Sequence, residues 1–129
     1  MNNNTRRLRF DVKLLEVIIT VLQQCRGIDQ RITREHLRRE LTWRINTHVS
    51  DRAMRAAIEN ARFTPEGALI CSTTRKGGGY YMARNTTELE AYLRQDESRC
   101  REIWQRCRRQ RAAAGLALAE ESISQMELM

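Results

Sequence analysis

Proline and glycine are scarce in this sequence, whose 129 residues include one proline and six glycines. A long disordered chain has a different composition, so we expect disorder only near the ends. There is no continuous apolar run of the roughly 18 residues that a membrane-spanning helix needs. The polar start, Met1-Asn2-Asn3-Asn4, does not have the pattern of a signal peptide. We therefore expect a cytoplasmic protein without a membrane partner, built as one domain or as a small domain with an extension.

The sequence also lacks the residue spacings that hold metal ions or catalytic groups. Cys100 and Cys107 lie seven residues apart, His36 and His48 are far from them, and no CxxC or HxxxH pattern occurs. This argues against a zinc site, and the absence of a signal peptide favours reduced thiols. Acidic residues fall beside arginines, as partners four residues apart on a helix would. We expect neither an enzyme nor a bound cofactor.

Aromatic residues make up only 5% of the chain, which argues against a protein that stacks single-stranded bases. Lysine occurs twice, whereas arginine occurs 21 times and the net charge is +7. The planar donor fork of arginine pairs bidentately with phosphate or guanine, where lysine offers a point charge. A genome rich in arginine codons would give the same bias, so composition alone does not identify a nucleic-acid-binding protein.

The positive charge is unevenly distributed along the chain. Residues 1–62 carry 13 basic and 7 acidic groups. Residues 63–85 carry 3 basic groups and 1 acidic group, and residues 86–129 carry 7 basic and 8 acidic groups. The net charges of these segments are therefore +6, +2 and −1. The basic excess in the first 85 residues suits a surface that binds a polyanion.

Residues 1–10 are predicted to be a flexible basic arm whose arginines (Arg6, Arg7 and Arg9) could enter a minor groove. Apolar residues at helical spacing predict a first helix from near Asp11 to Gly27. Thr33 is the expected cap of a second helix over residues 34 to about 41. Residues 42–49 are then a connection with Trp43 as an anchor.

Ser50 is the expected cap of a third helix, which ends at residue 62. Residues 68–73 and 80–83 are predicted strands of a hairpin, with a glycine-rich tip between them. Thr87 and Glu90 have the spacing of a capping box and predict a long helix from about residue 88 past residue 111. The last dozen residues are expected to be a frayed tail.

This order of elements resembles the winged helix-turn-helix family of biotin-repressor-like and related bacterial and phage regulators. The resemblance covers roughly residues 11–84, and the Gly-Tyr-Tyr strand followed by a Glu-Leu-Glu-x-Tyr helix is also similar to small winged-helix proteins encoded by bacteriophages. The residues that carry it are Thr33-x-x-x-Leu37, Val49-Ser50-Asp51-Arg52-Ala53-Met54-Arg55 through Ile58, and Leu69-Ile70-Cys71 followed by Gly79-Tyr80-Tyr81-Met82. The family usually has a tighter turn where this chain has residues 42–49.

The resemblance implies a mainly α fold with a small β-hairpin wing. A three-helix winged helix-turn-helix would occupy residues 11–85. The long C-terminal helix expected over residues 86–129 is not part of the family's common domain, so no role transfers to it. In such proteins the serine-led helix enters the major groove, so helix 50–62 is the expected reader of duplex DNA and the wing at 73–79 a backbone contact.

Within that reader, Arg52 and Arg55 lie three residues apart on one face and are the expected base contacts, together with Ser50. The alternative for the two arginines is that they are solvated charges opposite the core stripe. The hairpin tip is equally well described as a loose turn. The expected contacts to the DNA backbone are Arg34, Arg38, Arg39, Asn60, Arg62, Thr74, Arg75 and Lys76.

The predicted function is that of a double-stranded DNA-binding protein, a transcriptional regulator that acts at the nucleoid or, if it is phage-encoded, in the host cytoplasm. Because a fold does not fix a function, a winged-helix module that docks proteins is one alternative. An accessory protein of replication or recombination that holds DNA without sequence preference is another.

The C-terminal helix carries an interrupted apolar stripe that includes Leu93, Ile103 and Trp104. Such a stripe needs burial, either against the chain's own domain or in a homodimer formed through residues 88–118. The stripe is too short and too interrupted to identify a coiled coil, so both alternatives stay open. A two-fold dimer would suit a reader of palindromic DNA.

Overall fold

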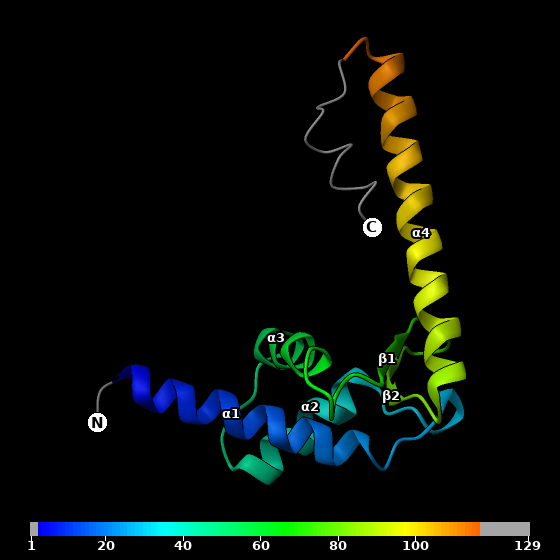
Figure 1. The fold of residues 1–129 in the computed structure, drawn as a ribbon. Helices are drawn as coiled ribbons and strands as arrows, with labels where there is room; N and C mark the ends of the chain where they lie inside the picture. The colour runs from blue at the N-terminus through cyan, green and yellow to red at the C-terminus, as the bar shows by residue number, and fades with distance from the viewer. Residues whose placement is uncertain (1–2, 117–129) are drawn as a thin grey trace. The chain divides into compact units, whose positions relative to one another are not determined.

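The computed structural model describes residues 3–116 (Figure 1). These residues form a mainly helical fold with one small antiparallel hairpin, which confirms the expected class at that level of detail. In order, the elements are α1 (Asn3–Leu22), the short 3-10 turn η1 (Ile28–Gln30), α2 (Arg34–Ile45), α3 (Asp51–Arg62), β1 (Ile70–Thr73), β2 (Gly79–Met82) and α4 (Thr86–Ala113). The chain divides into two compact units, one ending at Glu90 and the other beginning at Ala91.

Helices α1, α2 and α3 of the first unit surround a single apolar core. Helix α1 packs against both α2 and α3, and the stripe that α3 buries includes two alanines, Ala57 and Ala61. Small side chains let helix backbones approach closely, which positions α3 tightly on α1. The largest fully buried side chains are Leu14, Ile18, Leu22, Leu37, Leu41, Val49, Met54, Ile58, Ile70, Cys71 and Met82.

Side-chain caps set where α2 and α3 begin. The Thr33 hydroxyl accepts a hydrogen bond from the backbone N–H of His36 at 3.2 Å, and the Ser50 hydroxyl accepts one from Ala53 at 3.1 Å. Both residues have extended backbone angles, as an N-cap requires. The two predicted caps are therefore confirmed.

The hairpin pairs residues 70–73 with residues 79–82 in antiparallel register, with Ile70 opposite Met82 and Thr73 opposite Gly79. A third segment joins it, because Ile32 and Tyr80 exchange two backbone hydrogen bonds of 2.9 Å each. The residue just before α2 is thereby fixed to the return strand. Sequence patterns did not predict this pairing.

A glycine is required where that third segment meets the hairpin. Gly79 has φ +133°, and a Cβ placed on it would collide with the carbonyl oxygen of Ile32. That backbone region is open almost only to glycine. The close approach of the two chain segments therefore depends on the absence of a side chain at residue 79.

The prediction of a flexible arm over residues 1–10 is wrong for residues 3–10, which belong to α1. Phe10 lies four residues before the buried Leu14 and packs against the core, so it extends the buried stripe of the helix toward the N-terminus. Asp11, the expected start of the helix, instead lies inside it. Polarity favoured an arm, but residues 3–10 contain no proline or glycine that would stop a helix.

The predicted connection over residues 42–49 is also wrong in its first half, because α2 continues to Ile45. Ile45 lies four residues after Leu41 and packs against the same core. The helix ends at Asn46, which has the left-handed φ of 59° and donates its N–H to the Thr42 carbonyl at 2.9 Å. The connection to α3 is therefore residues 46–50, shorter than the sequence indicated.

Helix α4 begins at Thr86, two residues before the predicted start. Asn85 supplies the cap, since its side-chain oxygen accepts a hydrogen bond from the Glu88 N–H at 2.9 Å. Among the described residues, no side chain of α4 is buried. The predicted frayed tail falls mostly on residues 117–129, outside the part of the chain that the structure describes.

Candidate nucleic-acid interface

The exposed face of α3 lies opposite its buried stripe, as expected for an amphipathic helix. Met54, Ala57 and Ile58 face the core, whereas Arg52 and Arg55 are exposed. Ala56, Glu59 and Asn60 are the other exposed residues of this helix. The face is thus polar, with its two arginines in the N-terminal half and Glu59 in the C-terminal half.

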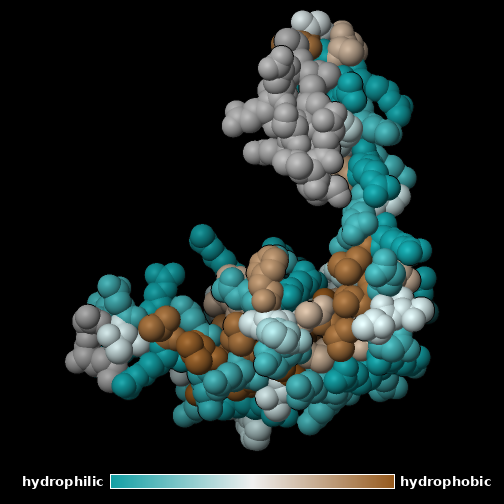
Figure 2. Space-filling view, viewed as in Figure 1, coloured by the Kyte–Doolittle hydropathy of each residue, from teal (hydrophilic) through white to brown (hydrophobic). Residues whose placement is uncertain are grey.

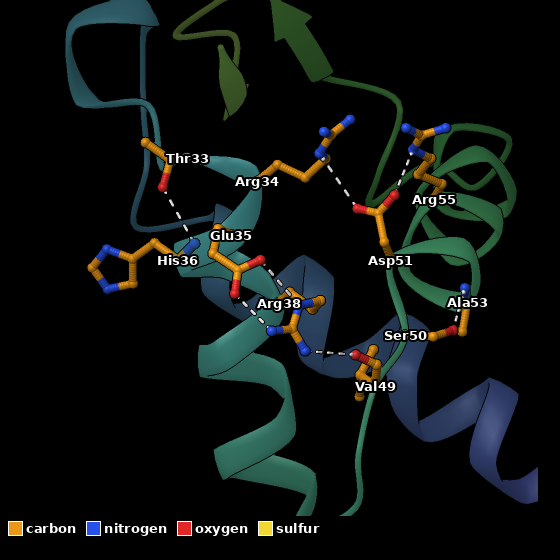
Figure 3. A network of polar contacts seen from close by, with 10 residues as sticks. All are labelled: Thr33, Arg34, Glu35, His36, Arg38, Val49, Ser50, Asp51, Ala53 and Arg55. Atoms are coloured by element: carbon orange, nitrogen blue, oxygen red, sulfur yellow. Dashed lines mark hydrogen bonds and ion pairs between the residues drawn. The ribbon is translucent and has the colours of Figure 1, made fainter. Parts of the chain in front are cut away.

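Asp51, in the first turn of α3, contacts one arginine from each of two helices (Figure 3). Its Oδ1 lies 3.4 Å from the Nε of Arg34 in α2, and its Oδ2 lies 3.1 Å from the Nε of Arg55 in α3. All three side chains are about half exposed, so solvent screens the pairs and each contributes little to stability. The consequence is positional: the carboxylate holds one guanidinium group from α2 and one from α3 beside it.

The terminal nitrogens of Arg34 and Arg55 are directed away from Asp51 (Figure 3). Both ion pairs use Nε, so the planar ends of the two side chains can still donate hydrogen bonds outward. The sequence marked Asp51 only as a favourable charge for the helix N-terminus. Its contact with Arg34 could not be predicted, because Arg34 and Asp51 are far apart in the sequence and meet only in the folded chain.

Arg38 has a different position from the one expected of a phosphate contact. Its guanidinium donates to both oxygens of Glu35, at 2.6 and 3.1 Å, and to the Val49 carbonyl at 3.3 Å. Its hydrogen bond lowers the pKa of Glu35, and Glu35 in turn raises the pKa of Arg38. Arg38 therefore ties α2 to the connection before α3, and these bonds occupy three of its donors.

Arg62, another residue predicted to contact DNA, is likewise engaged within the fold. Its Nε donates to the Ile70 carbonyl at 3.3 Å, and one terminal nitrogen donates to the Ser72 hydroxyl at 3.3 Å. The other terminal nitrogen pairs with Glu59 at 2.8 Å. Arg62 therefore fastens the end of α3 to β1, and with 24% of its side chain exposed it offers little surface to a ligand.

Arg39 and Arg52 are the more open cations of this region. The Arg39 side chain is 72% exposed, and its Nε is 3.9 Å from the nearest Glu35 oxygen. Arg52 is exposed, and the structure gives its side chain no ion-pair partner among residues 3–116. Ser50 is exposed as well, but its hydroxyl caps α3, so a contact to a base would use only its remaining hydrogen-bonding capacity.

The hairpin tip presents the expected Thr74, Arg75 and Lys76 on an exposed turn. The Arg75 N–H donates to the Thr73 hydroxyl at 3.1 Å, which shapes the turn. Arg31 links the tip to the segment before α2, since it donates to the Lys76 carbonyl at 3.4 Å and to the Ile28 carbonyl at 2.9 Å. The tip is thus positioned relative to α2 by an arginine that sequence reasoning did not assign to it.

The face of the first unit seen in Figure 2 is mostly hydrophilic, with separate hydrophobic patches, one of them along α1. Leu8 and Val12 of α1 are 64% and 51% exposed. Trp43, the predicted anchor of the connection, is 79% exposed, so that prediction is wrong. It borders an open hollow of about 590 Å³ lined also by Arg39, Thr42 and His48.

The chain matches no protein-family model, no curated protein and no solved structure. No group of three or more His, Cys, Asp or Glu side chains within residues 3–116 is placed to hold a metal ion. None of the helices described is long and apolar enough to cross a membrane. The geometry of the first unit therefore carries the functional proposal.

Proposed function

We propose that the first unit is a winged helix-turn-helix domain that binds duplex DNA, and that the protein regulates transcription in a bacterium or a phage-infected host. The order of α1, α2, α3 and hairpin supports this proposal, as does the pairing of Ile32 with Tyr80, which ties the segment before α2 to the hairpin. In the proposed complex α3 enters the major groove, α2 crosses the phosphates and the hairpin tip contacts the neighbouring backbone.

The observation that carries the proposal is the arginine cluster at the start of α3. Asp51 holds Arg34 and Arg55 together, and the next residue in the chain, Arg52, is exposed. Three guanidinium groups from two helices thus gather at the N-terminal half of α3, where the helix dipole also favours an anion. Guanidinium groups are the side chains best suited to guanine edges and phosphates.

Each residue then has a distinct role in the complex. Arg52 and Arg55 read base edges in the major groove, and Arg34 and Arg39 neutralise phosphates beside them. Arg75 and Lys76 contact the backbone from the hairpin tip. Ser50 contributes by fixing the start of α3 through its cap. Arg38 and Arg62 hold the scaffold, and neither has a ligand contact in this proposal.

The test is selection of sites from a random duplex pool by the full-length protein, followed by titration of the enriched site. Arg52→Ala and Arg55→Ala are each expected to cost about 1–3 kcal/mol and to relax the preference at one base position. Arg44→Ala is the matched control, because Arg44 is an arginine of α2 paired with Glu40 at 2.9 Å and has no proposed DNA contact. Unchanged selection by both α3 variants would contradict the assignment.

Exposed aromatic side chains favour a second candidate, a module that docks another protein. Trp43 and Phe63 are 79% and 84% exposed, and aromatic side chains are enriched at protein interfaces. Salt separates the two functions, since DNA affinity falls steeply with salt concentration. An absence of binding to any duplex at low salt would favour the docking module. Salt-sensitive binding without an enriched sequence would favour an accessory protein that holds DNA non-specifically.

A further inference from the structure

Helix α4 carries a seam of apolar side chains along one side. Leu93 and Ile103 are 42% and 45% exposed, although both are large apolar side chains. The seam includes an open hollow of about 500 Å³ lined by Asp96, Arg99, Cys100, Ile103, Trp104 and Cys107. All six belong to this helix, so the hollow is a feature of the α4 surface itself.

The seam repeats with the period of a helix that pairs with another helix. Leu93, Cys100 and Cys107 recur every seven residues, and the intervening positions are Leu89, Asp96 and Ile103, of which only Asp96 is polar. A seven-residue repeat with two apolar positions keeps one stripe facing a partner helix over several turns. The repeat therefore fits a helical partner along α4.

Charge is divided between the two halves of α4. Residues 86–97 contain four acidic residues and one arginine, a net charge of −3. Residues 99–111 contain six arginines and one glutamate, a net charge of +5. Two copies of the helix side by side in parallel would place like charges together, whereas an antiparallel pair would place each acidic half against a basic half.

We propose that α4 pairs with α4 of a second copy of this chain, antiparallel and centred on Ser98. In that register residues whose numbers add to 196 lie at the same level, so Leu93 meets the partner's Ile103 and Leu89 meets the partner's Cys107. Tyr92 lies level with the partner's Trp104. The same levels place the acidic half of one helix beside the basic half of its partner.

The antiparallel register uses both the apolar seam and the opposite charges of the two halves of α4. An antiparallel pair of identical helices has two-fold symmetry, which closes the assembly at two chains. The proposal does not depend on DNA binding, because the interface residues lie outside the proposed reader and the assembly is measured without DNA.

The first experiment measures the molar mass of the full-length protein by light scattering. The wild-type chain of 15.2 kDa is expected at twice that mass, and Ile103→Glu at the mass of one chain, because a carboxylate would be buried in the seam. Gln105→Glu adds the same charge on the opposite face of α4 and is expected to remain a dimer. Circular dichroism checks that both variants keep the helix. A monomeric wild-type protein, or a dimeric Ile103→Glu variant, would overturn the proposal.

The second experiment determines the orientation of the helices. Leu89→Cys is introduced together with Cys100→Ala, Cys107 is kept, and a short bismaleimide cross-links the protein before peptide mass spectrometry. The antiparallel register predicts a link between the cysteine at 89 and the partner's Cys107. Links joining residue 89 to residue 89, and 107 to 107, would show a parallel pair and overturn the register.

Discussion

Arg34 of α2 and Arg55 of α3 share one carboxylate, with their Nε atoms 3.4 and 3.1 Å from the two oxygens of Asp51. This arrangement places a negative charge at the centre of the proposed DNA-binding surface. Its carboxylate positions the two guanidinium groups, but it also opposes the approach of phosphates. The balance between these effects can be measured with one substitution.

Asp51→Asn is expected to raise duplex affinity by about 1 kcal/mol, roughly fivefold, because one surface charge that repels phosphate is removed. The Ser50 cap does not involve this side chain, so the helix start is retained. Titration of a duplex at two salt concentrations gives the measurement. Glu40→Gln, which also removes a carboxylate but from the pair with Arg44, is the control. Lower affinity for Asp51→Asn would mean that positioning of the arginines outweighs the repulsion.

Arg38→Ala is expected to destabilise the fold, because it removes both the pair with Glu35 and the hydrogen bond to the Val49 carbonyl. Arg39 lies on the same helix and makes only a 3.9 Å contact with Glu35, so Arg39→Ala is the matched control. The loss of unfolding free energy for Arg38→Ala should be about twice that of the control or more. Urea denaturation measures both. Equal losses would contradict a scaffold role for Arg38.

Acid is expected to weaken the fold through Glu35, whose pKa is lowered by the hydrogen bond from Arg38 and by the nearby arginine charges. A lowered folded-state pKa means that the stabilisation is complete above the unfolded pKa of about 4.3 and is lost as pH falls through the lower folded value. Glu35→Gln should therefore be less stable than wild type at pH 7. The difference should shrink below about pH 4. A difference in unfolding free energy that stays constant with pH would contradict this assignment.

Gly79→Ala is expected to destabilise the protein by more than about 3 kcal/mol, since it combines an unfavourable φ with a collision against the Ile32 carbonyl. Gly77 also has a positive φ, of +80°, but faces open space. Gly77→Ala should therefore cost only about 1 kcal/mol. Thermal or urea unfolding of the two variants measures how much the close approach of residue 79 to the Ile32 carbonyl adds to the loss of stability. Similar losses at both positions would argue against that contribution.

Cys71 is expected to resist alkylation in the folded protein. Its side chain is fully buried, and burial raises the pKa of the thiol to about 11. At pH 8, iodoacetamide should modify Cys71 roughly 100-fold more slowly in the folded protein than in urea, because the thiolate is the reactive form. Cys107 is exposed and serves as the internal control. Rapid labelling of Cys71 in the native protein would show that the hairpin opens from the core.

Local signals in the sequence were sufficient for the elements that depend on neighbouring residues. Thr33 and Ser50 were predicted as caps because a cap bonds to the backbone only three residues away. The stripe of α3 and the hairpin followed from periodicity and from glycines at the turn. The exposure of Arg52 and Arg55 was predicted from the same stripe, because they lie on the face of the helix opposite its buried residues.

The tertiary structure decided what depends on residues far apart in the chain. Helices α1 and α2 are longer than predicted because Phe10 and Ile45 pack against the shared core. The polarity of the neighbouring residues does not indicate this packing. Arg38 and Arg62 are bonded to distant parts of the fold, because Arg38 reaches Val49 and Arg62 reaches β1 only after folding. By itself the sequence determined which helix presents arginines. Only the tertiary structure decided which of those arginines have donors left for a ligand, because a guanidinium bonded to another segment of the fold, as in Arg38 and Arg62, has fewer left.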